Sequence, residues 1–210
     1  MISLSEILHT IAQALMIPCL IILIILMAGA VWQIGDIVVE YIAERRKHKC
    51  NVPQLLRDVH AAGADGLADL IENSGLLRRQ KKALLELAES RGLPKDTLTA
   101  LAERLLATEE ARNARTTSVT DMIAKLGPMF GLLGTLIPLG PGIVALGQGD
   151  TVTLSESMNV AFDTTIAGVI SAAVASVISH IRKRWYNDDM VSLETLMEAV
   201  LEEVTSDVEG

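Results

Sequence analysis

The sequence predicts an all-α membrane protein with three transmembrane helices joined by a helical cytoplasmic segment. Half of its 210 residues are hydrophobic but only 3% are aromatic, an unusual balance for the core of a compact soluble domain. Three long runs carry almost no charge. They have 29, 24 and 23 residues, and they lie between Glu6 and Asp36, between Lys125 and Asp150, and from Ser157 to Ser179. Because a helix needs about 20 residues to cross the hydrocarbon core, each run is long enough for one span.

These runs divide the chain into six segments. The first run is predicted to be a retained span because no basic residues precede it and no signal-peptidase site follows it. Its apolar part covers roughly residues 12–38, with a bend or cap near Pro18. The six segments are a first transmembrane helix (1–43), a cytoplasmic helical segment (44–118), a second transmembrane helix (119–147), an outer turn (148–156), a third transmembrane helix (157–181) and a cytoplasmic amphipathic tail helix (182–210).

The basic residues predict the orientation. Of the 18 Lys and Arg residues, 15 lie between Arg45 and Lys125, and the other three form the cluster 182–184 after the third run. By the positive-inside rule, the N-terminus and the outer turn lie outside a cell (inner or cytoplasmic) membrane, whereas residues 40–120 and the tail are cytoplasmic. The expected interfacial anchors near the cytoplasmic ends of the spans are Trp32, Tyr41, Trp185 and Tyr186.

The cytoplasmic segment has helix start and stop signals. Asn51-Val52-Pro53 is typical of a helix start, and Ser74-Gly75 ends the apolar pattern that follows. A second amphipathic stretch covers residues 76–90 and ends before Gly92. From Lys95 to Lys125 no helix breaker occurs, so the helix is expected to continue into the second span. The tail has a helical apolar stripe made of Leu193, Leu196, Met197, Val200, Leu201 and Val204.

Several function classes are disfavoured. The net charge of −8 and the lack of a basic stripe argue against nucleic-acid binding. Cys19 and Cys50 lie in different environments, and the four histidines have no metal-ligand spacing, so neither a disulfide nor a metal site is predicted. No phosphate loop, nucleophile elbow or zinc-protease motif is present. We therefore expect no enzyme, cofactor or metal.

Small residues recur at helical spacing in the last two spans. They are Gly127, Gly131 and Gly134 in the second span and Ala161, Thr165, Gly168, Ala172, Ala175 and Ser179 in the third. Pro138 is assigned to the same packing or pore face. One interpretation is close helix packing in lipid, where small residues let backbones approach. The other is that Thr135 and Thr165, both roughly 13–15 Å deep at 1.5 Å per residue, line a wet or proton-relaying path near the midplane.

Asp163 has three interpretations. It lies about 10 Å along the helix from Glu156 and can reach the outer interface. It can also hydrogen-bond structurally to Thr164 or a neighbouring helix, or it can admit ions. An ionised Asp at mid-helix costs about 2.5–3.5 kcal/mol, so it needs water or a partner.

Two prolines interrupt the backbone hydrogen bonds of the second span. Pro138 leaves the carbonyl of Gly134 without its helical donor, and Pro141 does the same to Ile137. We favour a kink with local repacking over an ion-coordinating break.

One stretch resembles a known family. Residues 127–135 read Gly-Pro-Met-Phe-Gly-Leu-Leu-Gly-Thr, which resembles the GP-x-x-GLLGT signature of the MotA/TolQ/ExbB proton-channel family. Residues 165–168, Thr-Ile-Ala-Gly, are similar to the T-x-x-G of that family's last span. The order of segments is TolQ/ExbB-like, and similarity at the level of sequence covers about residues 119–185.

The resemblance implies a function and partners. In this family, three-span subunits form a homopentamer around two single-span helices of the MotB, TolR or ExbD kind. Those helices carry a membrane-embedded Asp, and proton passage drives mechanical work. The resemblance implies that Thr135 and Thr165 flank the partner's Asp.

Three departures favour a divergent, archaeal-type branch. Pro138 and Pro141 stand where bacterial relatives have a valine or similar residue and a glycine-containing stretch. Val160 stands where TolQ and ExbB carry a Glu, and Asp163 has no expected counterpart.

Three functional hypotheses follow. The leading one is a proton (ion) channel subunit of a motor or energy-transducing complex, in contact with lipid and with a single-span Asp-bearing partner. The alternatives are a self-contained ion channel or small transporter, and a membrane-anchored scaffold whose cytoplasmic helices recruit soluble proteins. A neighbouring reading frame that encodes a single-span protein with an Asp early in its span would discriminate among them.

The predicted orientation can be tested at Cys50. Because this cysteine lies among the basic residues that the positive-inside rule keeps in the cytoplasm, an impermeant thiol reagent should label it in inverted vesicles and not in intact cells. The Cys50→Ser variant gives the background. Labelling of Cys50 in intact cells would reverse the topology.

Overall fold

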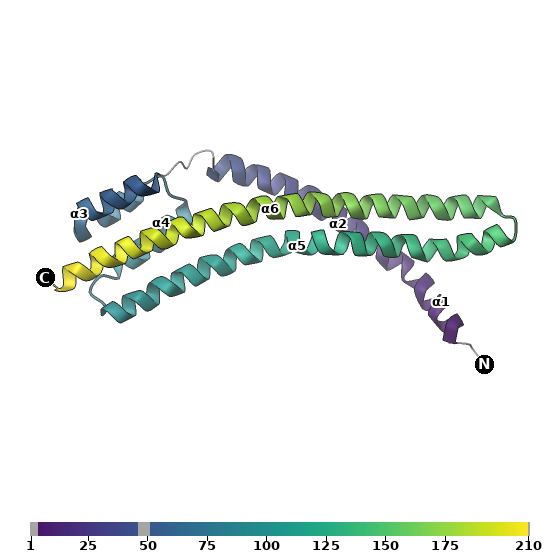
Figure 1. Cartoon of the computed structure of the whole chain (residues 1–210), viewed down its shortest axis with the longest axis horizontal. Helices are drawn as coiled ribbons and strands as arrows, with labels where there is room; N and C mark the ends of the chain where they lie inside the picture. The colour runs from purple at the N-terminus through teal and green to yellow at the C-terminus, as the bar shows by residue number, and fades with distance from the viewer. Residues whose placement is uncertain (1–3, 46–50, 210) are drawn as a thin grey trace. The chain divides into compact units, whose positions relative to one another are not determined.

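The computed structural model describes residues 4–45 and 51–209, and this part of the chain is helical without a strand (Figure 1). Cys50 lies outside the described residues. The elements in order are α1 (Leu4–Ala14), α2 (Met16–Glu40), the π-helical turn η1 (Tyr41–Arg45), α3 (Val52–Asn73), α4 (Arg78–Glu89), α5 (Lys95–Gly147) and α6 (Thr151–Glu209). Within these described residues, three helical regions are long and apolar enough to span a membrane: Glu6–Ala43, Lys95–Gly147 and Thr151–Ser206. The predicted all-α membrane fold is confirmed.

The bend expected near Pro18 corresponds to a break between α1 and α2 at Leu15. Proline has no N–H to donate to the carbonyl four residues earlier, which here belongs to Ala14, the last residue of α1. The backbone N–H of Cys19 still donates to the carbonyl of Leu15 at 3.0 Å, so helical bonding resumes at once.

Helices α5 and α6 are longer than the predicted segments. As expected, α5 continues from Lys95 into the second span without interruption. Only residues 148–150 separate α5 from α6, so residues 151–156 of the predicted outer turn are helical. The predicted third span and the predicted tail helix are both part of α6. Gly149 turns the chain with a φ of 79°.

Asp150 explains why α6 begins so early. One oxygen of its carboxylate accepts hydrogen bonds from the backbone N–H groups of Val152 and Thr153, both at 3.1 Å. The other oxygen accepts the hydroxyl of Thr153 at 2.5 Å. These bonds satisfy free donors of the first helical turn and hold the pKa of Asp150 below its ordinary value.

The chain divides into two compact units, described here separately. The apolar unit comprises residues 1–37 and 117–181, and the polar unit comprises residues 38–116 and 182–210. Both α5 and α6 contribute residues to each unit.

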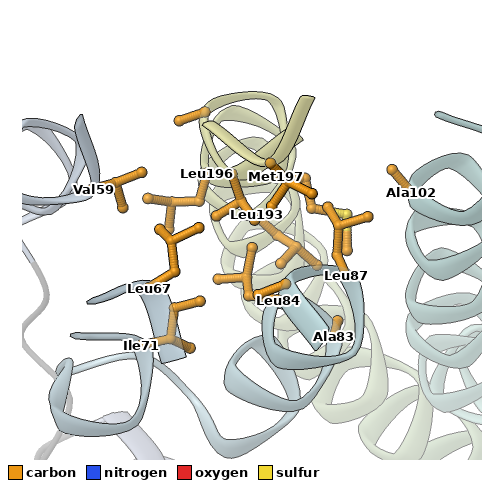
Figure 2. Close-up of a cluster of buried hydrophobic side chains, with 14 of the residues drawn as sticks. Val59, Leu67, Ile71, Ala83, Leu84, Leu87, Ala102, Leu193, Leu196 and Met197 are labelled. Atoms are coloured by element: carbon orange, nitrogen blue, oxygen red, sulfur yellow. The ribbon is translucent and has the colours of Figure 1, made fainter. Parts of the chain in front are cut away.

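The polar unit has a leucine-rich core (Figure 2). The helix starts and stops predicted around Val52, Ser74 and Gly92 agree with the bounds of α3 and α4. A left-handed glycine, Gly63 with φ 62°, bends α3 so that Val59 on one side and Leu67 on the other reach the same core. Figure 2 shows α4 and α6 completing it, and the tail stripe is at most 1% exposed at Leu193, Leu196, Met197, Val200 and Val204.

A buried ion pair lies at the edge of the polar unit. Arg182 is 1% exposed, and its Nε donates to Glu40 Oε2 at 3.1 Å. Tyr186 is also buried and hydrogen-bonds to Glu40. Beside it the rings of Tyr41 and Trp185 stack with centroids 6.1 Å apart. These three aromatic residues were expected as interfacial anchors, and each has a partner within the protein. Tyr186 bonds to Glu40, and Tyr41 and Trp185 stack on each other.

This ion pair should dominate the local stability. The Glu40→Ala substitution leaves the Arg182 guanidinium buried without this carboxylate, so we expect a loss of about 3–5 kcal/mol in the free energy of unfolding. Denaturant titration of the purified protein measures it. The control is Arg184→Met, which changes an exposed cation two residues away and should shift stability by at most about 0.5 kcal/mol. Equal effects of the two variants would contradict the assignment.

Candidate functional site

Within the apolar unit, α5 and α6 run antiparallel and touch through glycines. A Cβ added to Gly127 would lie 2.7 Å from the carbonyl oxygen of Gly168 and 3.0 Å from the Cβ of Ala172. A Cβ added to Gly168 would lie 2.5 Å from the carbonyl oxygen of Gly127 and 2.8 Å from the Cα of Gly131. No larger residue fits without movement, so these glycines pack the two helices backbone to backbone.

The contact continues along the hairpin through Gly134 and Thr164. A Cβ on Gly134 would lie 2.7 Å from the Cβ of Thr164, whose side chain is buried. The hydroxyl of Thr164 is 2.9 Å from the carbonyl oxygens of both Val160 and Ala161, so it donates within its own helix rather than to Asp163. Of the other predicted packing residues, Pro138, Ala161 and Ala172 are buried as well.

The sequence analysis placed Ser179 on this face but missed its partner Asp121, and it missed the pair Gly142 and Ser157 at the other end of the interface. Near the turn, a Cβ on Gly142 would lie 3.1 Å from the Cβ of Ser157. At the other end, the hydroxyl of Ser179 donates to the carboxylate of Asp121 at 2.5 Å. A signal for these pairs was present in the sequence. In an antiparallel hairpin, residues that face each other have a nearly constant sum of residue numbers, and both pairs have nearly the same sum as Gly131 and Gly168.

The two candidate threonines flank the interface. Thr135 and Thr165 are half-buried. Among the described residues, their two hydroxyl groups do not hydrogen-bond to each other. The hydroxyl of Thr135 donates to the carbonyl of Leu132 at 2.7 Å, and that of Thr165 donates to the carbonyl of Ala161 at 3.0 Å. With their protons used in this way, both hydroxyl oxygens keep lone pairs that can accept a hydrogen bond from outside.

Asp163 lies on the exposed surface of α6 in the single chain. Its neighbours on that surface are the large apolar residues Phe162 and Ile166, each 57% exposed. The next residue, Thr164, turns into the hairpin, so Asp163 faces away from α5. Among the described residues no cluster of three or more His, Cys, Asp or Glu side chains is placed to hold a metal ion.

The fold and this site define a multi-span membrane protein whose last two candidate spans form a glycine-packed hairpin. A family model described as the MotA/TolQ/ExbB proton channel family matches residues 70–195, more than half of the chain. The chain belongs to this family. The matched region contains the whole hairpin and both candidate threonines, and the family is one of channels rather than enzymes. No curated protein matches the chain closely enough to be reported as a relative.

The glycine interface predicts opposite outcomes for two similar substitutions. Gly168→Ala places a methyl group against the backbone of Gly127, so we expect a destabilisation of about 1–3 kcal/mol. Gly140→Ala adds the same methyl group in the same hairpin, but nothing lies within 4 Å of its Cβ. It should be neutral or slightly stabilising, since alanine favours the helix. Thermal unfolding in mild detergent measures both, and equal losses would show that the close approach is not present.

Proposed function

We propose that this chain is the proton (ion) channel subunit of a complex driven by an ion-motive force, working with a single-span membrane partner that carries an Asp. The observation that carries the proposal is the family match across the glycine-packed hairpin, with Thr135 and Thr165 at either side of the contact. We further propose that the hairpin turn lies outside the cytoplasmic membrane and that the N-terminus also lies outside, as the basic residues favour.

The apolar unit supports an oligomer, which we propose is a pentamer by its likeness to the family. Its helices expose many large apolar side chains, among them Met129, Leu132, Leu136, Ile143, Phe162, Ile166 and Ile170. A five-fold ring would cover part of this surface with neighbouring copies and leave the rest to lipid. Two partner helices would then occupy the centre.

The threonines suit the chemistry of a carboxyl group that binds and releases a proton. A protonated Asp on the partner can donate to the free lone pair of Thr135 or Thr165, because each hydroxyl proton is already bonded to its own helix. The ionised Asp, by contrast, needs a donor, which favours exchange with water. Asp163, exposed in the outer part of the same span, would attract cations toward this path.

The test compares three threonines of the hairpin. Thr135→Val and Thr165→Val keep volume and remove the proposed acceptors, so proton flux in liposomes containing the partner should fall at least tenfold while assembly is retained. Thr164→Val is the matched control: its hydroxyl is buried against Gly134, and its loss should cost about 1 kcal/mol of stability without blocking flux. Asp163→Asn tests the attraction of cations.

Each sample is first checked by mass measurement in mild detergent. A clean monomer with and without partner would contradict the channel assembly. Normal flux in both threonine variants would remove these residues from the ion path, and equal flux without any partner would favour a self-contained channel.

A further inference from the structure

Pro141 creates a defect in the second span. Its ring nitrogen has no hydrogen, so the carbonyl of Ile137 lacks the donor that an ordinary helix supplies. The structure keeps α5 helical through this region, and Ile137 is only 6% exposed. Inside a membrane, water does not satisfy such a carbonyl, so a protein group has to.

The side chain of Gln13 occupies the missing donor's place. Its Nε2 lies 3.5 Å from the carbonyl oxygen of Ile137 and donates to it from the last turn of α1. The donor and acceptor are 124 residues apart in sequence. Both belong to the apolar unit.

A second polar contact shows that this pairing is part of a register. Six residues after Gln13, the Sγ of Cys19 donates to the carbonyl oxygen of Phe130, seven residues before Ile137, at 3.4 Å. Six and seven helical residues rise about 9 and 10.5 Å, so the two contacts match an antiparallel alignment of the N-terminal helices with α5. Farther along, a Cβ on Gly29 would meet the side chain of Ile123 at 3.1 Å.

The contact satisfies two costly groups at once. A glutamine amide in an apolar environment loses its hydrogen bonds to water, and the Ile137 carbonyl has lost its helical donor. The hydroxyl of Thr10, three residues before Gln13 on α1, donates within its own helix to the carbonyl of Glu6 at 2.9 Å. The side chain of Gln13 instead reaches α5.

We propose that Gln13 is a positioning residue that replaces the backbone donor removed by Pro141 and holds α1 against the second span. The held carbonyl lies two residues after Thr135, so the contact also fixes the backbone beside one proposed ion-path residue. This last step rests on the proposed function. The contact itself does not.

A double-mutant cycle tests the contact on the full chain without a partner. Gln13→Leu should lower the folding equilibrium constant in mild detergent about threefold to tenfold. Pro141→Ala restores a backbone N–H for Ile137, so in that background the same substitution should have little effect. Any general effect of placing leucine at position 13 appears in both backgrounds and cancels. Equal losses in the two backgrounds would overturn the proposal.

Pro138→Ala is the matched control. It also replaces a proline of α5 by alanine, but the donor it restores serves Gly134 and not Ile137. The loss caused by Gln13→Leu should therefore persist in this background, and rescue by Pro138→Ala would overturn the proposal. If Gln13→Leu alone does not fold, recovery of folded protein by adding Pro141→Ala supports it, and no recovery overturns it.

The functional part has its own readout. With the partner present, Gln13→Leu should reduce proton flux, and Pro141→Ala should restore it. Unchanged flux in an active complex would overturn the positioning role. If the unmodified chain carries no protons, the proposed function fails while the stability cycle still decides whether Gln13 bonds to Ile137.

Discussion

The approach of two backbones at Gly127 and Gly168 is the contact on which the arrangement of the apolar unit depends. The carbonyl oxygen of Gly127 lies where a side chain of residue 168 would begin, and the carbonyl oxygen of Gly168 lies where one of residue 127 would begin. Shifting either helix by one residue would bring a larger side chain into that space, so the contact permits one register. That register then brings Gly134 against Thr164 and Ser179 to Asp121. It also leaves Thr135 and Thr165 at the sides of the hairpin, accessible from outside it.

The same two helices also contribute to the polar unit, but by different means. There they pack with α3 and α4 through leucines, and Arg182 of α6 pairs with Glu40 of α2. The difference follows from the solvent. In water, burial of large apolar side chains stabilises a helix bundle, whereas in lipid those side chains gain little from leaving the hydrocarbon, and close backbone contact takes over. The composition of α5 and α6 changes accordingly, from leucine-rich stripes to small-residue stripes.

Periodicity predicted the elements well because it reports on faces and lengths. Uncharged runs marked the spans, and the Pro and Gly signals marked the ends of α3 and α4. Rotation within a helix was harder to predict. The small residues Ala161, Thr165, Gly168 and Ala172 suggested that Thr165 faces the second span, but the buried threonine is Thr164. Adjacent residues differ by about 100° around a helix, and both choices fit a stripe of small residues. Only the way in which α5 and α6 cross decides whether Thr164 or Thr165 is the buried residue.

Long-range polar pairs were beyond the reach of sequence patterns for a related reason. The sequence shows that Pro141 leaves a carbonyl without a donor, but not that Gln13, on another helix, supplies one. These pairs also separate the polar side chains that have a partner within the apolar unit from one that is exposed on its surface. Thr164, Gln13 and Cys19 each find a carbonyl within the apolar unit, whereas Asp163 is an acid on an exposed apolar surface. If Asp163 lies at membrane depth rather than at the outer interface, holding it ionised costs about 2.5–3.5 kcal/mol unless water or a partner solvates it. At that depth lipid supplies neither, so the surface that carries Asp163 would suit another helix or a water-filled path better than the bilayer.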